Sequence, residues 1–184
     1  HVFDGGEPGE QSLMAAGLLV GMTSPRDVHG AQRPVDLFDT KSDAEAVLAA
    51  IGAPAKTQIM RNGGTTWHPG RHGQICLGPK KVLGAFGELH PKILSAFDVS
   101  GPAVAFVIFP GAVPLPRKTG VSRGPLQMHD FQTVDRDFAF IVDAKVPSQD
   151  IVNAAAGADK KLIASVMVFD EFFGGTMEKT EKSI

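Results

Sequence analysis

A stretch rich in proline and glycine, residues 110–125, divides this 184-residue chain into two parts. Such a composition disfavours helices and strands, because proline fixes φ and lacks a backbone donor while glycine favours turns. We therefore expect an extended linker over residues 117–125. It would join one domain at residues 1–116 to a second at residues 126–184.

The composition narrows the class of protein. With 43% hydrophobic residues the chain can bury a core, and its longest apolar runs are far shorter than the ~20 residues that cross a bilayer, so we expect no membrane partner. The net charge of −2 is spread evenly, and no excess of basic residues points to nucleic-acid phosphates. Cys76 is the single cysteine and cannot form an internal disulfide, so we expect a protein of the reducing cytoplasm. Its apolar neighbours indicate a buried side chain.

Two helices are predicted in the first part. Ser42 and Glu45 have the spacing of a capping box, and apolar residues then recur at helical spacing until Gly52, which predicts a helix over residues 42–51. A second, short helix is predicted over residues 91–97. Its first residue is a proline, whose missing N–H would have no helical partner at that position in any case.

Strands are predicted over residues 12–20, 74–77, 82–86 and 103–109. The middle two would form a hairpin, because a turn sequence containing Gly78 joins them. Gly17 either weakens the first strand or marks a close contact. The last strand is apolar on both alternating faces, as expected where a sheet is covered on both sides.

In the second part, the sequence pattern predicts a strand, a helix, a second strand and the beginning of a third strand. These elements cover residues 136–143, 147–156, 165–173 and 182–184. On the strand over 165–173, side chains alternate, so Asp170 and Phe172 share one face near the strand end. An exposed ring can stack on a nucleobase, and a carboxylate can accept a hydrogen bond from a base amino group. Alternatively, Phe172 and Phe173 are core residues and Asp170 ends the strand.

A histidine cluster offers an enzyme-like alternative. His68, His72 and His90, near Glu88, would suggest a zinc site if the first two shared one helical face. The intervening Pro69-Gly70 disfavours a helix, so we interpret these side chains as structural and expect no metal and no catalytic residue. A metal-dependent hydrolase stays as an alternative hypothesis.

Several short motifs follow one another along the chain. They are F-D-G-G-E-P-G-E-Q from Phe3, R-P-V-D from Arg33, H-P-G-R from His68, G-E-L-H-P from Gly87, R-D-F-A-F from Arg136, F-D at Phe169 and K-S at Lys182. In this order and spacing, the chain resembles the C-terminal portion of the bacterial phenylalanyl-tRNA synthetase β-subunit family over essentially its whole length.

The resemblance implies an α+β fold in two modules. Residues up to about 116 would form an antiparallel class II synthetase-like sheet module that has lost catalysis, followed by a truncated ferredoxin-like anticodon-binding domain. In the family, the partner α subunit binds ATP and phenylalanine in a heterotetramer. The complete enzyme therefore uses ATP and Mg²⁺, while this chain is expected to bind no cofactor itself.

The same resemblance implies a site for tRNA. Family positions that match Asp170, Phe172 and Ser183 contact the anticodon of phenylalanine tRNA. Position 172 is usually tyrosine, and phenylalanine keeps the stacking surface but loses the hydroxyl hydrogen bond. Four other family landmarks are interpreted as structural: His68, Arg71, Glu88 and His90.

We therefore expect a non-catalytic part of a ligase that attaches phenylalanine to its tRNA, supplying scaffold and part of the anticodon-recognition surface. A purely structural interaction fragment is the other main hypothesis. An incomplete β-α-β unit would leave apolar side chains such as Phe138 and Phe140 poorly covered.

Overall fold

The structure, a computed structural model, describes residues 1–115, 126, 128 and 130–184. It divides into two compact units, His1–Thr119 and Gly120–Ile184. The predicted linker over residues 117–125 lies outside the described residues. Within the first predicted domain, the proline-rich stretch begins with a short 3-10 helix, η1 (Pro110–Ala112). Within the described ranges, no helix combines the length and the apolar character needed to cross a membrane.

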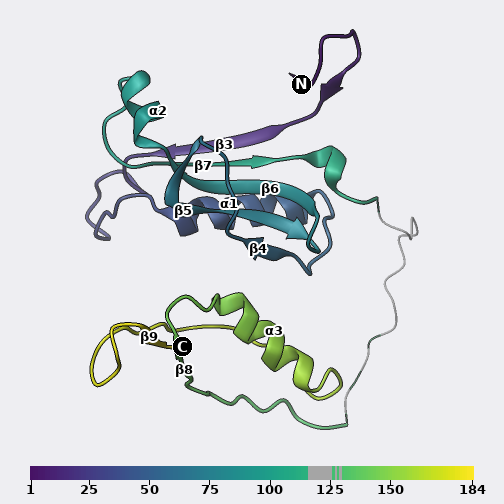
Figure 1. Ribbon diagram of the computed structural model, residues 1–184, viewed down its shortest axis with the longest axis vertical. Coiled ribbons are helices and arrows are strands. Elements are labelled where there is room, and N and C mark those ends of the chain that lie inside the picture. Colours follow the sequence, from purple (N-terminus) through teal and green to yellow (C-terminus); the bar gives the residue numbers. More distant parts are fainter. Residues whose placement is uncertain (116–125, 127, 129) are drawn as a thin grey trace. The chain divides into compact units, whose positions relative to one another are not determined.

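A five-stranded antiparallel sheet in the order β3-β7-β6-β5-β4 forms the first unit (Figure 1). Its strands are β3 (Ala15–Val20), β4 (Gln58–Met60), β5 (Trp67–Leu77), β6 (Lys81–Leu89) and β7 (Ala103–Ile108). The predicted hairpin is confirmed as β5 and β6, with both strands longer than expected. The predicted strand over residues 12–20 is instead two strands, because β2 (Gln11–Ser12) pairs separately with β1 (Val2–Phe3).

Helix α1 (Leu37–Ala50) packs against β3, β6 and β7. Its buried residues Thr40, Ala44 and Leu48 are spaced four apart, so one side of the helix faces the sheet. The apolar cluster that packs with this side of the helix comprises Ile75, Leu83, Phe86, Phe106 and Ile108. Burial of this cluster is the main source of stability in the first unit.

The start of α1 differs from the prediction. The helix begins at Leu37 rather than residue 42, because Asp36 and Asp39 form the capping box. The Asp36 carboxylate accepts from the Phe38 and Asp39 N–H groups at 2.8 and 3.2 Å, and Asp39 Oδ2 accepts from the Asp36 N–H at 2.9 Å. Aspartate supplies the same acceptors as the predicted Ser–Glu pair, so spacing alone does not distinguish the two boxes. The helix ends as predicted before Gly52, which has φ +79°.

The second unit contains β8 (Ile141–Asp143), α3 (Ser148–Ala158) and β9 (Glu181–Ser183). β8 pairs antiparallel with β9, and an isolated antiparallel bridge joins Phe172 to Ser183. β9 therefore lies between two segments that are connected through α3 (Figure 1). This split β-α-β arrangement is typical of ferredoxin-like folds.

Two of the predicted strands are much shorter than expected. Of residues 136–143 only β8 is a strand, and of residues 165–173 only Phe172 forms a bridge. A strand requires a hydrogen-bonding partner, and its apolar pattern alone does not supply one. The helix predicted at 147–156 and the strand opening at 182–184 are confirmed as α3 and β9.

Gly17 marks a close contact in β3. A Cβ atom at this position would lie 2.3 Å from Phe106 Cε1 in the core. We expect Gly17→Ala to lower the free energy of unfolding of the first unit by about 1–3 kcal/mol, as overpacking does. Urea denaturation measures this loss, and Gly70→Ala is the matched control because a Cβ there meets no atom within 4 Å. Equal losses in the two variants would contradict the prediction.

The Arg33–Asp39 ion pair makes stability depend on acid pH. Arg33 donates to both Asp39 oxygens at 2.6 and 2.7 Å, and this hydrogen bonding lowers the pKa of Asp39 to about 2. A carboxyl whose pKa is depressed by folding stabilises fully above its unfolded pKa of about 4, and loses that contribution as the pH falls towards 2. In urea titrations, the difference in unfolding free energy between wild type and Asp39→Asn should therefore shrink from pH 4 to pH 2. A difference that stays constant over this range would refute the assignment.

Candidate nucleic-acid interface

Phe172, in one of the two segments beside β9, pairs with Ser183 of β9. Each backbone N–H donates to the other residue's carbonyl, with N···O distances of 2.9 Å in both directions. On its other side, Ser183 lies opposite Ile141 of β8. Directly opposed residues of antiparallel strands place their side chains on the same face. We call the face that carries Ile141, Phe172 and Ser183 the front face.

Phe172 is 54% exposed on this front face. Phe173 is also exposed, so the alternative that both rings are core residues is wrong. An exposed phenyl ring next to a serine hydroxyl combines a surface for stacking with a hydrogen-bonding group, and together these suit a nucleobase.

Asp170 lies two residues before Phe172 and is exposed. Its Oδ1 accepts a hydrogen bond from the Glu171 N–H at 2.9 Å. Within the described part of the chain, no hydrogen bond to Oδ2 is present, so this oxygen can accept from an external donor. The structure thus pairs Phe172 with Ser183 directly and places Asp170 beside them along the chain.

Sequence reasoning missed an ion pair on the opposite, back face, which carries Glu171, Phe173 and Lys182. Lys182 Nζ lies 2.6 Å from Glu171 Oε1, and the Lys182 side chain is 2% exposed. Neither residue type nor spacing indicated this contact. The contact can be recognised only once the register is known. Because Phe172 pairs with Ser183, the residues before them, Glu171 and Lys182, are diagonal neighbours.

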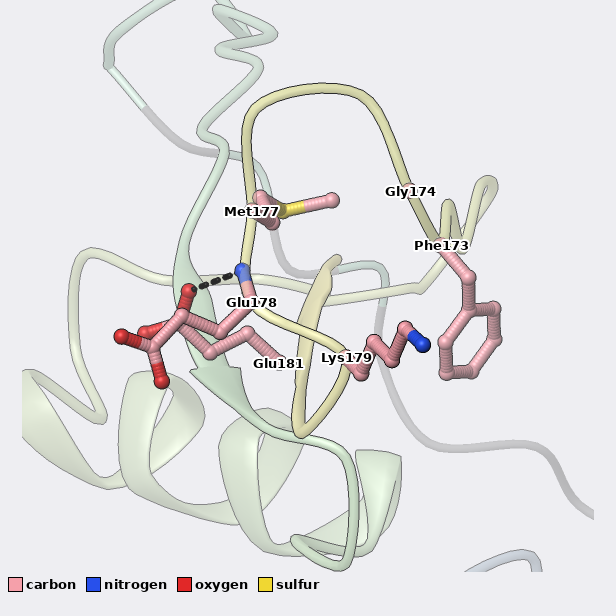
Figure 2. A pocket seen from close by; sticks show the side chains of 6 residues that line it. All are labelled: Phe173, Gly174, Met177, Glu178, Lys179 and Glu181. Atoms are coloured by element: carbon pink, nitrogen blue, oxygen red, sulfur yellow. Dashed lines mark hydrogen bonds between the residues drawn. The ribbon is translucent and has the colours of Figure 1, made fainter.

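The loop that joins Phe172 to β9 encloses a shallow pocket of about 280 Å³. Figure 2 shows Phe173 and Lys179 on one side of this loop and Glu178 with Glu181 on the other. The Glu178 N–H donates to Glu181 Oε2 at 3.1 Å, which closes the turn locally. Its lining includes none of Asp170, Phe172 and Ser183, so the pocket is a product of the loop rather than part of the candidate site.

The histidine pair of the first unit supports local structure. His68 and His72 lie in β5 rather than in a helix, as the intervening proline and glycine indicated. His68 Nδ1 accepts from the Gly70 N–H at 3.2 Å, and His72 Nδ1 lies 2.7 Å from the His68 carbonyl oxygen. Both imidazoles therefore engage the backbone of their own strand.

The remaining family landmarks are also engaged. Arg71 Nε forms an ion pair with Glu88 Oε2 at 2.6 Å between neighbouring strands. His90 is the N-cap of α2 (Pro91–Ala96), the short helix predicted from the sequence, and its Nδ1 accepts from the Lys92 N–H at 3.1 Å. A pocket of about 500 Å³ lies beside His90. Its lining comprises Gly63, Gly64, Thr65, Trp67, Pro69, His72, His90, Lys92 and Ile93.

No metal-binding arrangement emerges from these side chains. Among the residues that the structure describes, no three His, Cys, Asp or Glu side chains lie close enough together to hold an ion. Cys76 is buried, and burial raises the pKa of its thiol, which keeps the sulfur protonated and unreactive.

Comparison with known proteins points to one family over both units. A family model described as the phenylalanyl-tRNA synthetase β chain CLM domain matches residues 2–109. A second, described as a ferredoxin-fold anticodon-binding domain, matches residues 130–184.

Curated relatives agree with the family models. The phenylalanine–tRNA ligase β subunit of Ruegeria pomeroyi is 67% identical over 183 residues, which cover 100% of this chain and 23% of the relative. The subunit of the same name from Cereibacter sphaeroides is 59% identical over 96% of this chain and 22% of its own length. That of Rhodospirillum rubrum is 46% identical over 99% of the chain and 23% of its own length.

This chain thus spans about a quarter of the length of these relatives. One family model covers most of the first unit and the other covers the split β-α-β arrangement that carries the front face. The chain therefore belongs to the phenylalanyl-tRNA synthetase β-chain family, and its second unit is a ferredoxin-fold anticodon-binding domain.

Proposed function

We propose that this chain is a non-catalytic part of a phenylalanine–tRNA ligase β subunit, which supplies scaffold and part of the surface that recognises the tRNA anticodon. The complete ligase, with an α subunit as partner in a cytoplasmic heterotetramer, attaches phenylalanine to its tRNA with ATP and Mg²⁺. The observation that carries the proposal is the front face, where an exposed Phe172 is paired with Ser183 inside a domain of anticodon-binding type.

Each front-face group has a separate role in this proposal. The Phe172 ring stacks on an anticodon base, an interaction that does not require a particular base. The free Oδ2 of Asp170 accepts from an exocyclic amino group, and the Ser183 hydroxyl donates or accepts at a base edge. Single-stranded anticodon bases suit such a surface, since unstacked bases expose both their rings and their edges.

The first unit acts as a scaffold in this proposal. We assign it to a class II synthetase-like module that has no catalysis of its own, which its antiparallel five-stranded sheet with one packed helix supports. The rings of His68, His72 and His90 contact neighbouring backbone, and Arg71 pairs with Glu88; such contacts serve structure. These contacts also disfavour the alternative of a metal-dependent hydrolase.

Exposed aromatic side chains favour a second candidate function, that of a structural interaction fragment. Phe138 and Phe140 stack on each other with ring centroids 6.3 Å apart, yet they are 69% and 48% exposed. Exposed apolar clusters of this kind mark surfaces that bind other proteins. In that case the second unit would serve docking, and its front face would not contact RNA.

Replacement of Phe172 tests the anticodon function. In the complete subunit complex, we expect Phe172→Ala to weaken binding of a phenylalanine-tRNA anticodon stem-loop by about 1–3 kcal/mol, roughly 5- to 150-fold, since one stacked base is lost. Phe172→Tyr keeps the ring and should retain wild-type affinity or exceed it.

The matched control for this variant is Phe173→Ala. Phe173 is similarly exposed, at 57%, but lies on the back face, so its removal should leave the affinity nearly unchanged. If Phe172→Ala binds the stem-loop as tightly as wild type, the stacking role is refuted.

Hydrogen exchange of the 184-residue chain tests the second candidate. The amides of Phe140, Phe172, Ser183 and Ile184 donate to backbone carbonyls across β9, so they should exchange more slowly than in an unfolded chain. Mass spectrometry of peptides from residues 130–184 measures this protection. Exchange at the unfolded rate throughout these residues would instead favour the structural fragment.

A further inference from the structure

Lys182 is the one side chain of the second unit that is buried, within the residues described there. Every apolar side chain of that part is at least partly exposed, so the most enclosed position holds an ammonium group. A buried charge is costly unless it is paired and hydrogen-bonded. Its position therefore calls for a specific partner.

Glu171 is that partner. Its Oε1 lies 2.6 Å from Lys182 Nζ, within hydrogen-bond distance. Because Phe172 lies opposite Ser183, the residues that precede them in sequence are diagonal neighbours on the back face. The ion pair thus joins the same two segments as the Phe172–Ser183 bridge, but from the other side.

The bridge leaves the segment before β9 weakly attached. Phe172 is the only residue between 159 and 180 that pairs with a strand, and it does so through two backbone hydrogen bonds. The ion pair is a second attachment, one residue away. The Glu171 N–H in turn donates to Asp170 Oδ1 at 2.9 Å, so fixing Glu171 also orients the Asp170 carboxylate.

We propose that Glu171 and Lys182 are positioning residues of the anticodon surface. They hold Asp170, Phe172 and Ser183 in register from the back face and do not touch the RNA themselves. This inference rests on the proposed function and adds two residues to it. It also explains why a lysine next to the site is enclosed instead of facing phosphates.

For a variant that removes the Glu171 charge, electrostatics alone and the positioning role predict changes in RNA affinity of opposite sign. This difference makes the proposal testable. Removal of an acidic charge from a surface that binds RNA should, by charge alone, raise the affinity. If Glu171 positions the site, its removal should lower the affinity. Lys182 would lose its partner, and the segment that contains Phe172 would lose its second attachment to β9. The two explanations therefore cannot give the same result.

The experiment measures anticodon stem-loop binding by the complete subunit complex at several salt concentrations. We expect Glu171→Gln to bind roughly tenfold more weakly, within the range of coupling between contacting residues. Glu171→Asp keeps the charge but shortens the side chain, so it should show a smaller loss in the same direction. Glu178→Gln, an equal charge change in the exposed loop, is the control and should not weaken binding.

Two further readouts separate positioning from direct contact. The slope of log affinity against log salt should match wild type in Lys182→Met, since a lysine that contacts a phosphate would lower the slope by about one. Amides of Phe172 and Ser183 should exchange faster with solvent in Glu171→Gln than in wild type.

The outcomes distinguish this inference from the function on which it rests. Weaker binding by Glu171→Gln with an unchanged salt slope supports the positioning role. If Phe172→Ala weakens binding while Glu171→Gln binds as tightly as wild type or more tightly, the positioning role is overturned and the anticodon function stands. If neither variant changes the affinity, the anticodon function itself fails.

Discussion

The antiparallel pairing of Phe172 with Ser183 is the contact on which the proposed site depends. Because side chains alternate along an extended segment, this register decides which of the residues 170–173 face each side. A slip by one residue would turn Phe172 to the back face and bring Glu171 to the front. The register thus determines at once the stacking ring, the serine beside it and the buried ion pair.

Each of the two units is stabilised internally by a different kind of interaction. In the first, α1 and the sheet bury an apolar cluster around Ile75, Phe86 and Phe106, which is strong but non-directional. In the second, the described residues enclose only Lys182, whose contact with Glu171 depends on direction and distance. Buried ion pairs add little net stability, yet in some proteins they select one arrangement among several. A surface that reads bases needs precise side-chain positions more than it needs a large core.

The sequence correctly predicted the elements that are determined by residues close to one another in the chain. The β5–β6 hairpin followed from its turn, and α2 followed from its first proline, since both signals lie within a few residues. The predicted start of α1 was wrong because Asp36 and Asp39 form a capping box with the same kind of hydrogen bonds as the predicted Ser42–Glu45 box. The strand over 165–173 was too long because its partner β9 offers few residues, and pairing between distant segments is absent from local sequence. The Lys182–Glu171 pair depends on that register and was missed for the same reason.

The adjacent acidic residues Asp170 and Glu171 face opposite sides of the extended segment, so their carboxylates have different surroundings. Two free carboxylates at the edge of an RNA-binding surface would repel phosphates, and the chain's net charge of −2 offers no general compensation. The pleat points Glu171 to the back, where Lys182 neutralises it, so under the proposed function a single carboxylate, that of Asp170, faces the bases. With no local excess of cations, affinity from phosphate contacts has to come from outside this surface. Under the proposed function, the front face contributes selectivity among anticodons, because its groups address bases and not the backbone.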